Sequence, residues 1–545
     1  MSEFLHNASD VADGMSPWSF RGGTGRRGPL VSILLPTHNR RWCLPEALAS
    51  VLQQTYRNLE VFVVRDGGED VADVVRSFGD PRVIFIDRKE NRGKPYSLNE
   101  ALQRTNGKYV AYLDDDDRYY PHHVETLVEA LETRSDAQAA YSDLYKTYYE
   151  TRSGGERFVL SKQVEISRDF DRFFMMYFNH VLHVSLMHRR DLLDKTGLYN
   201  ENLNILIDWD MTRRLAFFTD FHHVLTITGE FSSPIGESDR ISVQRRKNRQ
   251  EYQRNVLAIR TTHPPKPWPK IGELAIILIL DRLDKQAAQF VGRIWQLTFY
   301  PYRLYIPLPP ADLSRLSVEM PNVTLVPVRP ESSAQERVDA VLRQAEGEYV
   351  AIASGGLAIE DAWVENPLYA LMNNGDRPEA FLIRGAGFGM QGLVARRTDL
   401  LRARKACPDW SVEDSLTACG IEMRLPRSEE LPFQFDDLLQ QANGAAADGD
   451  WLIAARLFEL IAERHRNGIW MKGLAARAYF EAGRHAEAGR LSREVNEVRP
   501  TVDTLLLEAK LRRRQKDPAG AAGLLCRAEQ QLSGQADWLR EDQVR

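Results

Sequence analysis

Short apolar runs alternate with amphipathic stretches along the first part of the chain. Four of these runs end at polar or turn-forming positions, as buried parallel strands do. They lie at residues 31–35, 59–64, 83–86 and 109–113. Residues 46–54 and 97–104, which lie between the runs, have the pattern of helices. This alternation predicts a mostly parallel α/β sheet.

Polar motifs directly follow three of the predicted strands. They are Pro36-Thr37-His38-Asn39, Asp66-Gly67 and the run Asp114-Asp115-Asp116-Asp117. In open α/β sheets, ligands bind beyond the carboxyl ends of the strands. We therefore expect the three motifs to converge on one crevice.

A second region, residues 271–432, repeats the sequence pattern of the first but lacks its aspartate run. Residues 338–341 and 347–351 match residues 98–101 and 107–111 in the same order. Continuing that register places Ser354-Gly355-Gly356-Leu357 where the aspartate run stands. Further along, Arg396-Arg397 matches Arg189-Arg190. These matches predict a second, degenerate copy of the same fold, which we expect to be inactive.

The C-terminal region is rich in Ala, Leu, Arg and Glu and has helical periodicity. Ala454, Ala488 and Ala522 are spaced by 34 residues, and turn signals recur at the same period. A helix–turn–helix repeat of this length is the tetratricopeptide signature, and about three repeats are needed for a stable stack. We expect the small residues at these positions to let paired helices approach closely.

The stretch from about residue 244 to 270 is basic and contains several prolines, including Arg245-Arg246-Lys247. It is interpreted either as an interdomain helix and linker with a solvated face, or as a contact for an anionic ligand or membrane. The expected organisation is a flexible arm at 1–28, an α/β domain at 29–243, a linker at 244–270, a degenerate α/β domain at 271–432 and helical repeats at 433–545.

Composition narrows the class of protein. The 545 residues carry a formal net charge of -5, so no global basic field indicates nucleic acid as a partner. No apolar stretch approaches the roughly 18 residues of a membrane-spanning helix. The four cysteines form no CxxC pair, which favours a reducing compartment. We therefore expect a cytoplasmic protein.

Four adjacent carboxylates after a buried strand are costly, because like charges repel and raise one another's pKa. A divalent cation removes that cost. Hard oxygen ligands suit Mg²⁺ or Mn²⁺, which typically bridge to a substrate diphosphate. The alternative is an acidic turn or a helix cap, where Asp is also common.

At this point the sequence resembles family 2 glycosyltransferases of the GT-A fold, a Rossmann-like mixed sheet. The resemblance runs from about residue 30 to 235. Five motifs carry it in the family's order: Pro36-Thr37-His38-Asn39-Arg40, Asp66-Gly67, Asn91-Arg92-Gly93, Leu98-Asn99-Glu100-Ala101, and Gly107 to Asp117.

The resemblance implies a nucleoside-diphosphate sugar donor, with a UDP-sugar favoured, and a divalent metal, Mn²⁺ or Mg²⁺. It implies a direct metal ligand in Asp116, together with Asp114, and less certainly Asp115 and Asp117. Lys94 could contact phosphate as a point charge or be a solvated surface lysine. The expected nucleotide-binding residues are Pro36, Thr37, His38, Asn39, Arg40, Asp66, Gly67, Lys94, Asn99, Asp114 and Asp115.

The family also has a later acidic motif, and residues 207–215 fit its place, with Ile207 where a Glu is usual. The resemblance implies that Asp208 is the general base of an inverting transfer. Asp208 could also, or instead, be the N-cap of a helix starting near Trp209. The rival base is Asp210. Two histidines, His180 and His183, could face the acceptor or the metal, although a lone His is more often structural.

These observations favour an inverting glycosyltransferase that acts on an acceptor hydroxyl. The helical repeats suggest a protein acceptor such as bacterial flagellin, recruited by the repeat region. The alternative is a transferase of cell-surface polysaccharide or lipid-linked glycan synthesis. An alternative of another class is a non-catalytic interaction scaffold in which the repeats are the working part.

Overall fold

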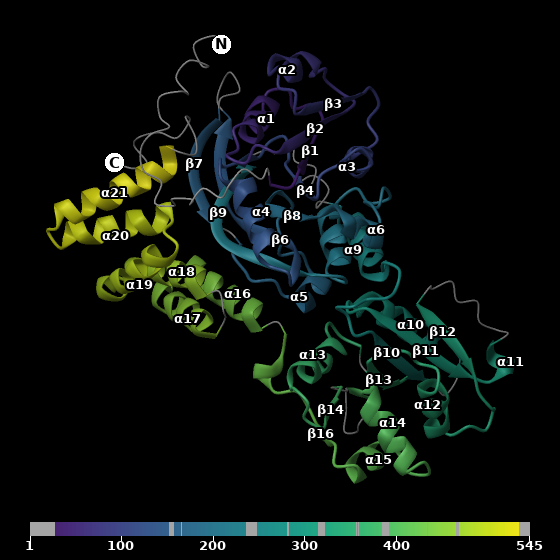
Figure 1. Ribbon diagram of the computed structural model, residues 1–545. Coiled ribbons are helices and arrows are strands. Elements are labelled where there is room, and N and C mark those ends of the chain that lie inside the picture. The colour runs from purple at the N-terminus through teal and green to yellow at the C-terminus, as the bar shows by residue number, and fades with distance from the viewer. Residues whose placement is uncertain are drawn as a thin grey trace.

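The computed structural model describes residues 28–151, 157–164, 166–235, 248–280, 283–313, 322–355, 357, 359–383, 392–432, 434–464 and 468–533. Two mixed sheets and then a helical region follow one another along the chain (Figure 1). Most of the expected N-terminal arm and the basic triplet Arg245-Arg246-Lys247 lie outside the described residues.

The first sheet has a parallel centre and antiparallel additions. Its strand order is β3-β2-β1-β4-β8-β6-β9-β5, and β7 pairs with β6. The first four of these strands run parallel, and β8 is antiparallel to both β4 and β6. The strands are β1 (Val31–Thr37), β2 (Leu59–Asp66), β3 (Val83–Arg88), β4 (Tyr109–Tyr112), β5 (Arg118–Tyr119), β6 (Ala137–Thr151), β7 (Arg157–Val164), β8 (Leu186–Arg189) and β9 (Asp220–Pro234).

All four apolar runs form strands, so the alternating α/β pattern is confirmed for this sheet. The second predicted helix begins at Lys94, earlier than the sequence pattern indicated. Gly93 precedes it with a φ of +92°, and Pro95 lies in its first turn, where a missing N–H costs nothing. The helices are α1 (Leu44–Leu52), α2 (Ala72–Ser77), α3 (Lys94–Leu102), α4 (His123–Thr133), α5 (Arg172–Tyr177), α6 (Leu193–Thr196) and α7 (Ile207–Leu215).

The second sheet has the order β12-β11-β10-β13-β15-β14-β16. Its strands are β10 (Leu274–Ile279), β11 (Tyr302–Leu308), β12 (Val323–Pro327), β13 (Tyr349–Ser354), β14 (Glu379–Leu382), β15 (Gly392–Arg396) and β16 (Glu422–Arg424). They are connected by α10 (Lys285–Leu297), α11 (Pro310–Leu313), α12 (Ala334–Leu342), α13 (Glu365–Asn373), α14 (Arg397–Ala406) and α15 (Val412–Ala418).

The two sheets share strand order, strand direction and local register. Each sheet begins with four neighbouring parallel strands, β3-β2-β1-β4 in the first and β12-β11-β10-β13 in the second. An antiparallel strand, β8 or β15, comes next. Tyr109 on β4 lies opposite Arg189 on β8, and Tyr349 on β13 lies opposite Arg396 on β15. The next residue in each case, Arg190 or Arg397, donates its N–H at 2.9 Å to the carbonyl that precedes the tyrosine. These pairs are the ones that the sequence comparison aligned.

The sheets are packed together and not loosely tethered. Residues of both belong to one buried hydrophobic cluster. The ring of Phe173 on α5 lies 5.4 Å from that of Tyr300 and 4.9 Å from that of Tyr369. Helix α9 (Arg249–Thr261) joins the sheets, and the buried Arg213 donates hydrogen bonds to the carbonyls that end it. The described part of the predicted linker is therefore held by packing.

The C-terminal region forms successive helix hairpins over its described residues. Its helices are α16 (Gln434–Ala447), α17 (Trp451–Arg464), α18 (Gly468–Glu481), α19 (His485–Val498), α20 (Val502–Arg514) and α21 (Pro518–Ser533). Nowhere in the described chain is there a helix whose length and apolarity would let it cross a membrane.

The period of this region shortens by one residue at its end. Gly449 and Gly483 make the first two turns with positive φ, but in the third turn Lys516 takes that conformation, 33 residues after Gly483. As a result Ala454 and Ala488 are fully buried, whereas Ala522 is exposed and Ala521 takes the buried position. The prediction that Ala522 lies at a close helix contact was therefore wrong by one residue.

The helical region docks on the first sheet beside β7 and β9 (Figure 1). Arg499 is buried and pairs with the buried Asp143 of β6, and it donates a 2.7 Å hydrogen bond to Ser167. On its other side, Asp143 contacts His223 of β9 at 2.9 Å. Trp470 of α18 donates to the Val164 carbonyl at 3.1 Å. A buried ionic group thus joins regions far apart in the sequence.

Candidate functional site

The loops after β1 and β2 meet at one end of the first sheet, as the sequence predicted. His38 Nδ1 lies 2.7 Å from the Asp66 carbonyl, and Asn39 Oδ1 accepts a 2.8 Å hydrogen bond from the Glu69 N–H. Gly67 has a φ of +67°, and a Cβ there would lie 2.6 Å from the Asn91 nitrogen. A larger residue could not fit at this point.

The carboxylate of Asp66 lies at the same end of the sheet and is buried. It accepts a 2.8 Å hydrogen bond from the Arg92 N–H and lies 3.3 Å from Arg88. Arg92 in turn stacks over the ring of Tyr96 at 3.6 Å. Asp66 is therefore a fixed acidic group held beside basic and aromatic side chains.

The aspartate run lies at the end of β4 and makes a tight turn, in which the Asp117 N–H donates to the Asp114 carbonyl at 3.1 Å. Asp115, Asp116 and Asp117 are buried. Burial, and then the neighbouring Asp116, raises the pKa of Asp115 to about 7. This shift has the direction expected from the sequence, in which neighbouring aspartates raise one another's pKa.

Basic and hydroxyl side chains from other elements hold the run in place. Arg40 Nη1 lies 3.2 Å from Asp115 and 2.9 Å from Asp116. Thr37 donates to Asp115 at 2.7 Å, and the Ser232 N–H donates to Asp117 at 2.9 Å. Two of the expected nucleotide residues, Thr37 and Arg40, thus contact the run itself.

The donor set of the run fits a hard divalent cation. Oxygens of Asp114, Asp116 and Asp117 lie within 4.8 Å of one another. Carboxylate oxygens are what Mg²⁺ and Mn²⁺ prefer. Asp115 is outside this group of oxygens and accepts a hydrogen bond from Thr37, so it supports the turn. The three aspartates are therefore the residues that would hold a metal.

Lys94, the first residue of α3, is not a solvated surface lysine. Its Nζ lies 2.5 Å from Asp114 Oδ1. Burial would lower the pKa of Lys94, but the carboxylates of Asp114, Asp208 and Asp117 together raise it above its ordinary value. Lys94 is therefore a fixed cation that interacts with the aspartate run and with Asp208 at once.

Asp208 is the second residue of α7 and not its N-cap. The cap position belongs to Leu206, which has a φ of +60°, an uncommon conformation for a non-glycine residue. Asn179 Nδ2 donates to Asp208 at 3.0 Å. Burial raises the pKa of Asp208, while Lys94 opposes the rise. The expectation that Asp208 caps the helix was wrong because the helix begins at Ile207.

The rival base has a different environment. Asp210 is buried and pairs with Arg214 at 2.6 Å, and Arg214 also donates to the Thr196 carbonyl at 2.6 Å. This ion pair ties α7 to the end of α6. Asp210 is therefore engaged within the fold, and Asp208 is the better placed of the two to accept a proton.

The two candidate histidines also differ. His180 accepts a 3.2 Å hydrogen bond from the Asp171 N–H at the start of α5, which is a structural position. His183 stacks on Tyr112 at 4.2 Å, and its Nε2 lies 2.8 Å from the Tyr199 hydroxyl. Burial, and then the charge of Lys94, lowers the pKa of His183 to about 3, so His183 is a neutral ring beside the site.

Asn99 lies away from this cluster of contacts. Its amide donates at 2.9 Å to the Tyr199 carbonyl and to Glu201, and its oxygen accepts the Tyr199 N–H at 2.8 Å. The side chain is thus committed to the loop before α7, and we no longer include Asn99 among the nucleotide-binding residues. We keep Pro36, the residue before Thr37 at the end of β1, on the basis of the resemblance alone.

Two residues of the site were not singled out from sequence. Asn179 orients Asp208, and Arg157 of β7 donates at 3.1 Å to the Asp116 carbonyl and at 3.0 Å to Ser232. Arg157 also lies over the exposed ring of Trp42, 4.7 Å from its centre. Neither residue belongs to a motif. Tertiary packing brings the segment after α5 and the start of β7 to the site.

Residues 32–189 match the family model described as Glycosyl transferase family 2. An uncharacterized glycosyltransferase of Rickettsia typhi is 31% identical over 34% of this chain and 57% of its own length. An uncharacterized glycosyltransferase of Bacillus subtilis is 28% identical over 34% of this chain and 68% of its own. A putative teichuronic acid biosynthesis glycosyltransferase of that organism is 34% identical over 20% of this chain and 44% of its own. The matches thus span about half to two thirds of these relatives.

Solved structures that are similar include Staphylococcus aureus TarS in complex with UDP-GlcNAc, at 17% identity over 43% of this chain and 66% of that chain, with a TM-score of 0.34. A mannosyltransferase of Pyrobaculum calidifontis in complex with GDP-Man and Mn²⁺ is 19% identical over 44% and 66%, with a TM-score of 0.31. We infer nothing from likenesses this low. Residues 32–189 thus match the glycosyltransferase family 2 domain, and the relatives similar to this part of the chain are named as glycosyltransferases.

Proposed function

We propose that this chain is an inverting glycosyltransferase that moves a sugar from a nucleoside-diphosphate donor to an acceptor hydroxyl. One observation carries the proposal: Lys94 connects the aspartate run, which suits a metal–diphosphate, with the partly buried carboxylate of Asp208. The proposed leaving-group site thus contains a cation that forms an ion pair with Asp114 and whose charge also acts on the candidate base Asp208. A direct displacement needs a base for the acceptor hydroxyl and stabilisation of the leaving group, and these residues could supply both.

Each group has a role in this proposal. A divalent cation held by Asp114, Asp116 and Asp117 would offset the negative charge of the departing diphosphate. Asp208 accepts the proton of the acceptor hydroxyl, and Asn179 holds its carboxylate in position. The loops that contain His38, Asn39, Arg40, Asp66 and Gly67 bind the nucleotide.

The donor is proposed to be a UDP-sugar, and the acceptor a protein such as flagellin that the helical region presents, in a cytoplasmic enzyme. The hairpins of that region support the acceptor part, because tetratricopeptide stacks typically bind peptides or proteins. A second candidate acceptor is a cell-surface polysaccharide, because one relative is named for teichuronic acid biosynthesis. The scaffold alternative is disfavoured by the intact site of the first sheet.

The proposal is tested with Asp116→Ala in the full chain. We expect Mn²⁺ binding, measured by electron paramagnetic resonance, to weaken, and donor hydrolysis across a panel of nucleotide sugars to fall about 100-fold or more. Asp136→Ala, an exposed aspartate of the same domain, is the matched control. The proposal fails if the wild type uses none of the donors, or if Asp116→Ala retains full activity.

The charge of Lys94 is expected to set the acid limit of activity. Burial raises the pKa of Asp208 and Lys94 lowers it, so Lys94→Met should raise this pKa further. A base works only when ionised, so activity is lost as the pH falls through that pKa. The acid limb of the kcat–pH profile should therefore move to higher pH in Lys94→Met and stay in place in Lys94→Arg. A limb that moves to lower pH would contradict this role.

A further inference from the structure

A cavity of about 190 Å³ lies in the second sheet, in the place that the functional site occupies in the first. It is bounded by the ends of β10 and β13, the first turns of α12 and α15, and the start of β15. In the first sheet, the ends of β1 and β4 and the first turns of α3 and α7 carry the candidate site. The cavity of the second sheet therefore lies at the end that corresponds to the candidate site of the first.

The correspondence extends to individual positions. Lys94 begins α3 and Ala334 begins α12, while Asp208 is second in α7 and Glu413 is second in α15. Close packing is shared as well. A Cβ on Gly107 would lie 2.7 Å from the Ser32 nitrogen, and one on Gly347 would lie 2.9 Å from the Ala275 nitrogen. The cavity is thus the equivalent of the first site, in which Ser354 replaces the first aspartate of the run.

The substitutions change what the cavity can bind. The cation and the acidic run are gone, so among the described residues the lining offers neither a phosphate-binding side chain nor a cluster of metal ligands. One carboxylate, Glu413, is kept, and it disfavours an anion. The positive end of α12, at Ala334 and Gln335, disfavours a cation. The ligand that suits this lining is therefore neutral.

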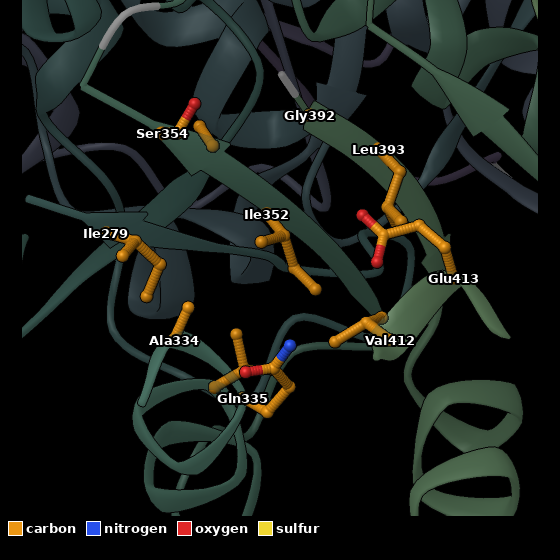
Figure 2. Close-up of a pocket in the computed structure, with 11 residues that line it drawn as sticks. Ile279, Ala334, Gln335, Ile352, Ser354, Gly392, Leu393, Val412 and Glu413 are labelled. Atoms are coloured by element: carbon orange, nitrogen blue, oxygen red, sulfur yellow. The ribbon is translucent and has the colours of Figure 1, made fainter. Parts of the chain in front are cut away.

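The polar groups suit hydroxyls. Figure 2 shows the Glu413 carboxylate directed toward Ile352 at the centre of the pocket, with Gln335 at the opposite edge. In the described part of the chain, no hydrogen bond or ion pair engages either side chain. A carboxylate accepts two or more hydroxyl donors, and an amide both donates and accepts. Ile352, Val412 and Leu393 supply an apolar wall for the C–H face of a ring.

We propose that this cavity binds a neutral sugar residue without acting on it, so that the second sheet holds a saccharide unit of the substrate or product. The choice of a saccharide rests on the proposed transferase function, but the site and its residues are separate from those of the first sheet. The cavity is smaller than the roughly 300 Å³ of typical drug-sized pockets, which limits it to a single small unit.

The test uses the full chain carrying Asp116→Ala with no nucleotide sugar present, so that no transfer to the probe can occur at the first site. Saturation-transfer NMR with methyl glycosides of glucose, galactose, mannose, rhamnose and N-acetylglucosamine should detect binding of at least one of them. Ala334→Phe fills the cavity from an exposed position and should abolish that signal. Its matched control is Ala406→Phe, on the exposed end of α14.

Glu413→Gln should weaken the same glycoside roughly tenfold, because a hydrogen bond to a charged group is lost. Glu429→Gln, an exposed glutamate of the same domain, should have no effect. The proposal is overturned if none of the five glycosides binds, or if binding is unchanged in both Ala334→Phe and Glu413→Gln. Failure of the transferase proposal is seen separately, in donor hydrolysis by the wild type.

Discussion

Asp208→Asn is expected to lower kcat for transfer by about 10²–10⁴-fold, the usual contribution of a general base. The amide keeps the size of the side chain and the hydrogen-bonding position beside Asn179, but it cannot take the acceptor proton. The donor should still bind, because the aspartate run and the nucleotide loops are unchanged. The measurement is steady-state kinetics with the donor that the wild type uses, in which KM for the donor should change little.

Two controls separate the role of Asp208 from general damage. Asp194→Asn, an exposed aspartate at α6, should leave kcat unchanged. Asp210→Asn breaks the ion pair with the buried Arg214, so we expect a lower unfolding temperature with kcat largely retained in the folded enzyme. If Asp210→Asn abolished turnover while Asp208→Asn did not, the two assignments would have to be exchanged.

Arg499→Met is expected to destabilise the protein by about 3 kcal/mol, because it leaves the buried Asp143 without its main cation. Ser167 and His223 still contact Asp143, which places the cost at the lower end of the usual range. The change should appear as a lower thermal unfolding midpoint. Hydrogen exchange should also become faster in α18, α20 and β6, where the two regions meet.

The reason for this loss can be tested by a second substitution. Adding Asp143→Asn to Arg499→Met removes the unpaired charge and should recover part of the stability. Arg513→Met, an exposed arginine on α20, should change the midpoint little. A full loss of stability in Arg513→Met, or no loss in Arg499→Met, would show that the ion pair does not hold the regions together.

This docking changes how the helical region can be studied. Deleting residues 433–545 would remove Arg499 and the Val502 N–H, which donates to the buried Tyr145 hydroxyl at 3.1 Å. Loss of transfer after such a deletion would then report instability of the first sheet as well as loss of acceptor binding. Substitutions on exposed helix surfaces away from this interface are the better probe of the acceptor.

Much of the fold could be predicted because helices and strands depend on the pattern of apolar and polar residues within short segments. Each apolar run of the first sheet became a strand at nearly the predicted positions, and the alignment of Arg396-Arg397 with Arg189-Arg190 reappears as matching strand register. Helix boundaries that depend on an unusual backbone conformation could not be predicted from the sequence. The start of α7 at Ile207 and the turn at Lys516 both use a non-glycine residue with positive φ, which no residue type signals.

The candidate site also has features that the sequence predicts and features that only the tertiary structure shows. The sequence by itself determined which carboxylates follow a strand end and how they are spaced, because a strand and its following turn are continuous in the chain. Only the tertiary structure decided their partners: Lys94 for Asp114, Arg40 for Asp116 and Asn179 for Asp208.

The contact that joins the helical region to the first sheet is the extreme case, since Arg499 and Asp143 lie 356 positions apart. The periodicity of a sequence shows which face of its own helix or strand a residue occupies. A contact between residues this far apart in the sequence depends instead on how whole elements pack. The sequence therefore determined the elements, the repeat of the sheet and the acidic run, and the packing of those elements decided which charges are paired.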